Sequence, residues 1–135
     1  MARPYQWQNR IRFVDTDASQ RIHYTAMFRH FEAAEQEFLR DMGCPYSDPA
    51  FRDVSFPRVH VECDFTAEIR YDDVITIELT VDRVGTSSFT ISFHVTVDAR
   101  PVAKGKITVV TIDRKTQKPC RIPDQLVGVL RSHLA

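Results

Sequence analysis

One amphipathic segment early in the chain constrains the fold more than any other feature. An apolar residue recurs every three or four positions along it, which is the spacing of one helical stripe: Met27, Phe31, Ala34, Phe38 and Met42. Thr25 is the predicted N-cap, Gly43 stands where a helix-ending glycine belongs, and Pro45 prevents continuation. The pattern therefore predicts one long helix of roughly 18 residues, about 27 Å from end to end.

Most of the remaining chain shows the two-residue alternation of β-strands. Apolar and polar residues alternate in 7–13, 59–67, 75–82 and 89–97, and a run rich in β-forming residues covers 102–112. Turn-forming residues separate the later segments at 71–73, 85–88 and 98–101. We expect the last four strands to form an antiparallel meander with one apolar face. Gly105 is predicted to be a bulge or a close backbone approach, and 124–134 a short terminal helix.

One long helix and about five strands with one apolar face fit together if the sheet curls around the helix and buries its stripe. The predicted fold class is therefore α+β, with an antiparallel sheet around a long central helix, in a single domain over residues 1–135. Such a sheet has open edges, so we expect a homo-oligomer formed by edge pairing or face packing.

Charge and cysteine content exclude several classes of protein. Eighteen Lys and Arg residues balance eighteen Asp and Glu residues, which argues against a nucleic-acid partner or an anionic membrane surface. Cys44, Cys63 and Cys120 lack the spacing of a disulfide framework or a zinc site. The first residues lack the apolar run of a signal peptide, and no apolar stretch is long enough for a membrane span. We expect a cytoplasmic protein.

The segment 15–24 carries the densest polar chemistry and directly precedes the predicted helix. A helix N-terminus offers unpaired N–H groups and a positive partial charge, which can polarise a carbonyl group. A carboxylate in the preceding loop can then act as a general base or a nucleophile, as acyl transfer or hydrolysis requires. The same residue types also suit plain turn and capping roles.

The stretch 12–34, RFVDTDASQRIHYTAMFRHFEAA, resembles the signature of the hot-dog-fold acyl-CoA thioesterases. It is most similar to the 4-hydroxybenzoyl-CoA thioesterase group and the Tol-Pal-associated acyl-CoA thioesterases. Segments 67–74 and 103–113 resemble the family too, so the likeness spans nearly the whole chain. The resemblance implies hydrolysis of an acyl-CoA to a free acid and coenzyme A, by a homodimer or tetramer with its active site at a subunit interface. It implies no metal and no cofactor apart from the coenzyme A of the substrate.

The family's catalytic groups fall on three residues of this loop. Asp17 matches the catalytic carboxylate, which acts as a nucleophile or a general base. Tyr24 supplies the backbone N–H that polarises the carbonyl, and His23 lies beside it. Two features depart from the family. Gln20 replaces a glycine, and the turn 85–87 lacks the basic cluster with which the hydroxybenzoyl enzymes meet the phosphates of coenzyme A.

Substrate-binding residues are predicted in two groups. Met27, Phe28 and Phe31 on the helix should wall the acyl group. Cations elsewhere must then meet the coenzyme A phosphates, and the candidates are Arg58, Arg70, Lys104 and Lys106.

Two other functions remain open. A non-catalytic module that binds acyl-thioesters, or a partner of acyl carrier protein, would fit Gln20 and the missing basic cluster. A hot-dog hydratase or dehydratase would need His23 or His60 to pair with an acidic residue across a cleft. Glu35 is a possible second carboxylate, whereas the strand face with His60, Glu62 and Asp64 is expected to meet solvent or another subunit rather than a metal.

Overall fold

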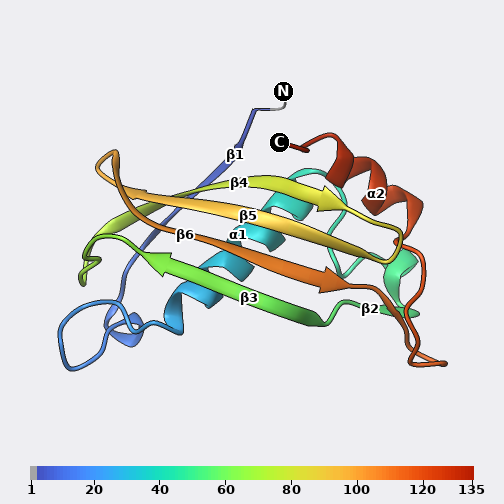
Figure 1. Ribbon diagram of the computed structural model, residues 1–135, viewed down its shortest axis with the longest axis horizontal. Helices are drawn as coiled ribbons and strands as arrows, with labels where there is room; N and C mark the ends of the chain where they lie inside the picture. Colours follow the sequence, from blue (N-terminus) through green and yellow to red (C-terminus); the bar gives the residue numbers. More distant parts are fainter. Residues whose placement is uncertain (1–2) are drawn as a thin grey trace.

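The computed structural model describes residues 3–135 and shows an α+β fold built on one antiparallel sheet (Figure 1). In spatial order, its five strands are β1 (Tyr5–Arg10), β4 (Val74–Val84), β5 (Ser88–Val97), β6 (Arg100–Val110) and β3 (Arg58–Phe65). Two short strands pair separately, β2 (Val54–Ser55) and β7 (Ile112–Asp113). The helices are α1 (Ala26–Asp41) and α2 (Asp124–Arg131), with short 3-10 turns η1 (Phe13–Asp15) and η2 (Pro49–Phe51).

Helix α1 confirms the predicted amphipathic segment, with 16 residues rather than about 18. Thr25 is the N-cap, but its hydroxyl lies 2.8 Å from Nδ1 of His23 and makes no capping bond to the helix. At the other end, Gly43 takes a left-handed φ of +73°, a conformation that glycine adopts at little cost. The sequence therefore placed both helix ends within two residues.

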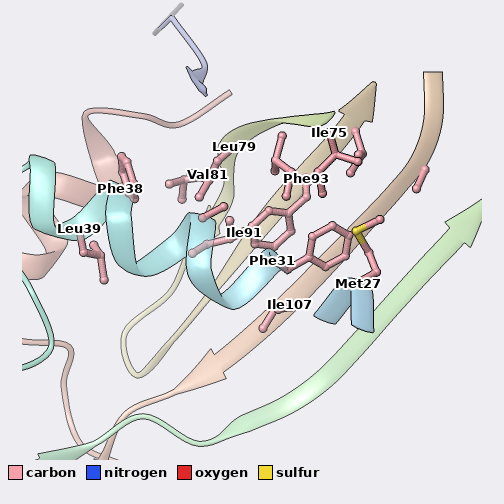
Figure 2. Close-up of a cluster of buried hydrophobic side chains, with 14 of the residues drawn as sticks. Met27, Phe31, Phe38, Leu39, Ile75, Leu79, Val81, Ile91, Phe93 and Ile107 are labelled. Carbon is pink, nitrogen blue, oxygen red and sulfur yellow. The ribbon is translucent and has the colours of Figure 1, made fainter. Parts of the chain in front are cut away.

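The apolar stripe of α1 packs against the sheet. Figure 2 shows this core, with Met27, Phe31 and Phe38 of the helix near side chains of the strands. The ring of Phe31 stacks on that of Phe93 with centroids 4.3 Å apart. A Cβ atom at Gly105 would lie 2.5 Å from the Phe31 ring, so Gly105 is the predicted point of close approach and leaves room for the helix.

Strand β3 departs from the predicted order. It pairs with β6 rather than with β4, and β4 pairs with β1, so the meander contains only β4, β5 and β6. As a result, β3 is a sheet edge, and its apolar side chains Val59, Val61 and Phe65 are 61%, 46% and 41% exposed. Alternation predicted an apolar face correctly but could not show whether anything within the chain covers it.

The structure also bears on the predictions for the first strand, the cysteines and a membrane span. The first strand ends at Arg10, and Phe13 begins a 3-10 turn instead of continuing the strand. All three cysteines are free thiols. Within residues 3–135, neither helix is long and apolar enough to cross a membrane.

Candidate active site

The loop before α1 forms a small hairpin, which we define as residues 16–22. Thr16 and Ile22 pair across it, and the N–H of Asp17 donates to the carbonyl of Arg21 at 3.0 Å. The turn closes with the N–H of Gln20 donating to the carbonyl of Asp17 at 3.0 Å. Gln20 has a φ of +67°, the left-handed conformation that a glycine would adopt more easily. The turn is therefore tight even though glycine is missing.

The Asp17 carboxylate lies exposed at the tip of this hairpin. Its Oδ1 atom accepts hydrogen bonds from the N–H of Ser19 at 2.8 Å and from the Ser19 hydroxyl at 2.5 Å. These two bonds, helped by the charges of His23 and Arg21 nearby, hold the pKa of Asp17 below its ordinary value of 3.8. Asp17 is thus a fully ionised carboxylate at neutral pH.

The backbone N–H of Tyr24 lies just before the start of α1. Its neighbours are all engaged: the N–H of His23 donates to the carbonyl of Asp15 at 2.7 Å, and that of Thr25 to Nδ1 of His23 at 3.2 Å. Among residues 3–135, the Tyr24 N–H donates to no acceptor. A free donor at the positive end of a helix is the arrangement that stabilises a developing oxyanion.

The predicted acyl walls lie deeper than expected. Met27 and Phe31 are completely buried in the core. Phe28 is half-buried and packs edge-on against Phe31, with ring centroids 6.1 Å apart. In this arrangement, Phe28 alone of the three offers surface to a ligand.

The predicted cations do not gather at the hairpin as one group. Lys104 and Lys106 alternate with the inward residues of β6, so they lie on the sheet face away from α1, and Lys106 pairs with Asp82 at 3.1 Å. Arg70 lies beside the hairpin, where it pairs with Glu68 at 2.6 Å and its backbone bridges to Arg21.

Arg58 and Glu35 form a pair that the sequence did not predict. Arg58 Nη2 lies 2.8 Å from Oε2 of the fully buried Glu35, and the Tyr46 hydroxyl donates to the same oxygen. Burial raises the pKa of Glu35 above its ordinary value, although the Arg58 charge opposes this. Arg58 begins β3, whereas the segment after β3 docks on the hairpin through the bond from the Ile22 N–H to the Ile69 carbonyl. Glu35 lies in the middle of α1, about 14 Å along the helix from its start beside the hairpin.

Two arginines flank the turn that looked uncharged in the sequence. Arg121 and Arg131 line a groove of about 430 Å³ together with Gly85 and Thr86. They come from α2 and the segment before it, at the opposite end of the sheet from the hairpin (Figure 1). No local pattern reveals them, because they lie more than 30 positions from the turn.

Two other histidines each lie near a carboxylate. His60 pairs with Glu62 of the same strand at 2.9 Å, on an exposed face rather than across a cleft. His30, which the sequence analysis did not single out, lies 3.3 Å from Asp15 and is buried. Within the described part of the chain, no three His, Cys, Asp or Glu side chains come together as a metal-ion group.

Comparison with known proteins supports the same class. The model of the thioesterase-like superfamily matches residues 11–130, and the chain belongs to that superfamily. A 1,4-dihydroxy-2-naphthoyl-CoA hydrolase of Prochlorococcus marinus (strain MIT 9303) is 29% identical over 84% of this chain and 81% of that protein.

Solved structures agree with this assignment and show that the fold is the hot-dog fold of thioesterases. A hypothetical protein from Aquifex aeolicus is 30% identical and has a TM-score of 0.88, covering 94% of this chain and 99% of that one. A gentisyl-coenzyme A thioesterase is 25% identical with a TM-score of 0.84, covering 93% and 99%. The narrower resemblance to the 4-hydroxybenzoyl-CoA and Tol-Pal-associated groups remains a prediction.

Proposed function

We propose that this chain is a cytoplasmic acyl-CoA thioesterase that cleaves an acyl-CoA to a free acid and coenzyme A. The observation that carries the proposal is the pairing of an exposed, ionised Asp17 with a free Tyr24 N–H in one short loop. A carboxylate and an oxyanion donor are the two groups that thioester hydrolysis without a metal requires.

The loop suits a two-step reaction. With the thioester carbonyl oxygen on the Tyr24 N–H, Asp17 attacks the carbonyl carbon, the carbon–sulfur bond breaks, and coenzyme A leaves as its thiolate. Water then hydrolyses the mixed anhydride and restores the carboxylate. The alternative is that Asp17 removes a proton from the attacking water. Its lowered pKa keeps the carboxylate ionised for either role at neutral pH.

Hydroxylated aromatic acyl groups are the first substrates to try. The two functionally named relatives act on 1,4-dihydroxy-2-naphthoyl-CoA and gentisyl-CoA, both of which are aromatic thioesters. The half-buried Phe28 ring could pack against such a group, with Met27 and Phe31 supporting it from the core.

A homodimer through the β3 edge would complete the site, and a tetramer could form from two such dimers. The edge exposes backbone groups and the apolar Val59, Val61 and Phe65, which together favour pairing with a second copy. Antiparallel pairing would bring the Arg58 end of one β3 beside the Phe65 end of the other. The groove with Arg121 and Arg131 would then approach the partner's hairpin, where it could bind the coenzyme A phosphates. Arg58, Arg70, Lys104 and Lys106 are the other cations available for that role.

The test is release of free thiol from a panel of short, long and aromatic acyl-CoAs, with Asp17→Asn beside the wild type. Turnover by the wild type that disappears in a folded Asp17→Asn variant supports the proposal. Turnover retained in that variant would remove Asp17 from its role. Binding of coenzyme A or acyl carrier protein without turnover would favour the binding-module function, and hydration of an enoyl chain would favour the hydratase.

A further inference from the structure

A buried polar chain lies directly beneath the hairpin and joins three elements. It consists of Asn9 on β1, His30 on α1 and Asp15 in η1. His30 and Asp15 are each only 5% exposed. Buried polar groups are costly unless they are paired, so two of them in contact with each other and with the half-buried Asn9 need a physical reason.

The contacts set the proton on the His30 ring. Nδ1 of His30 lies 3.2 Å from the side-chain nitrogen of Asn9, which can only donate, so Nδ1 must accept. The proton of the neutral ring then sits on Nε2, 3.3 Å from Oδ1 of Asp15. Burial lowers the pKa of His30, which keeps the ring neutral at pH 7. The contact with Asp15 is close but is not a hydrogen bond, since Nε2 has no hydrogen-bond partner among residues 3–135.

Asp15 connects His30 to the loop that carries Asp17 and Tyr24. Its Oδ2 atom accepts the N–H of Arg12 at 2.9 Å, and its backbone carbonyl accepts the N–H of His23 at 2.7 Å. The partly exposed Arg29 adds a cation 3.4 Å from Oδ1. Asp15 thus holds both ends of the loop: the turn before Asp17 and the residue before the Tyr24 N–H.

We infer that Asp15 and His30 are positioning residues that fix the Asp17 carboxylate relative to the Tyr24 N–H. This inference rests on the proposed thioesterase function. Neither side chain reaches the substrate, because both are buried behind the hairpin. Their effect is on geometry, and a misplacement of about 1 Å can cost on the order of 100-fold in rate.

The experiment compares two variants of His30 with a matched control. His30→Leu removes both ring contacts, whereas His30→Gln keeps an N–H donor at the position of Nε2. The control is Thr90→Val, which removes the buried Thr90 hydroxyl that lies 2.9 Å from the Thr108 hydroxyl, between β5 and β6. Steady-state turnover, thermal unfolding and hydrogen exchange of peptides covering 16–24 are measured for each.

The expected result is a kcat for His30→Leu lower by about 10- to 100-fold with KM unchanged, and recovery of most of that loss in His30→Gln. Thr90→Val should keep the wild-type kcat even at an equal drop in melting temperature. Exchange in 16–24 should accelerate only in His30→Leu. Wild-type kcat and exchange in His30→Leu, or an equal kcat loss in Thr90→Val, would overturn the inference.

The exchange measurement separates the two claims. If the wild type hydrolyses no acyl-CoA, the proposed function fails. Faster exchange of 16–24 in His30→Leu would still support positioning of the loop, and unchanged exchange would contradict it.

Discussion

Two carboxylates, one on a surface turn and one in the core, show how differently one chemical group can be used. Asp17 lies in solvent on a turn, and donated hydrogen bonds lower its pKa. Glu35 lies in the core with Arg58 and Tyr46, and burial raises its pKa. The sequence offered both as possible reactive groups. The difference between them is access: Asp17 can meet a thioester, whereas the partners of Glu35 already occupy one of its oxygens within the protein.

Removal of a buried charge and of an exposed charge should also have different effects on stability. A buried ion pair adds little net stability but leaves a large penalty when one member is removed. An exposed carboxylate on a turn contributes little to the core, so its loss should affect chemistry more than stability. Mutations around Glu35 should therefore change the free energy of unfolding, whereas mutations around Asp17 should change turnover.

The largest stability effect should follow Arg58→Met. This variant leaves the buried Glu35 without its cation, and we expect a loss of about 3 kcal/mol in the free energy of unfolding at pH 7. Denaturant unfolding measures it. The control is Arg10→Met, which breaks the exposed pair with Asp72 and should cost less than about 1 kcal/mol. Equal losses in the two variants would show that the Glu35 cluster is no more structural than the surface.

Glu35→Gln should make the free energy of unfolding depend less on pH. Because the folded pKa of Glu35 is raised above 4.5, the folded state binds its proton more tightly than the unfolded state. This group therefore favours folding most at low pH, and its contribution falls as the pH rises above 4.5. Unfolding curves across the pH range should show a smaller decline for Glu35→Gln than for the wild type. Parallel curves would contradict the raised pKa.

At the other carboxylate, Ser19→Ala should shift activity rather than stability. Without the Ser19 hydroxyl, the pKa of Asp17 rises toward its ordinary value, while the Ser19 N–H bond remains. The proposed reaction uses the ionised carboxylate. As the pH is lowered, kcat/KM should therefore begin to fall at a higher pH in Ser19→Ala than in the wild type. A pH profile of kcat/KM checks this shift. An acid limb at the wild-type position would mean that Ser19 does not set the pKa of Asp17.

The smallest effect should come from Gln20→Gly. Relief of the left-handed backbone at Gln20 slightly exceeds the entropy that glycine loses on folding, which predicts a gain of about 0.5 kcal/mol. The same change at Gln36, on the exposed side of α1, should instead cost about 1 kcal/mol. Thermal unfolding distinguishes the two, and a loss at both positions would argue against strain at Gln20.

Much of this fold was readable from local patterns. The stripe from Met27 to Phe38 predicted α1, and Thr25 and Gly43 marked its ends, because helix periodicity and capping depend on neighbouring residues. Strand pairing was harder. The alternation in β3 says nothing about which strand lies beside it, so its place at the edge of the sheet came only with the structure.

The candidate site divides in the same way. Asp17, His23 and Tyr24 are close in sequence, so a resemblance over one segment could find them together. Whether they perform the reaction remains a prediction. The link between His30 and Asp15, and the groove of Arg121 and Arg131 with the turn at Gly85, join residues from different elements. Such contacts depend on tertiary packing, which a single sequence does not encode in any local pattern.

The most direct test of the contrast between the two carboxylates is a comparison of Asp17→Asn with Glu35→Gln. Both replace a carboxylate with its amide, so size is retained and charge is lost. With the best acyl-CoA substrate of the wild type, Asp17→Asn should lose about 100- to 10,000-fold in kcat while its melting temperature stays close to wild type. Glu35→Gln should keep its kcat within about threefold and change in stability instead. A reactive Asp17→Asn enzyme, or a folded but inactive Glu35→Gln enzyme, would contradict the assignment of the chemistry to the hairpin.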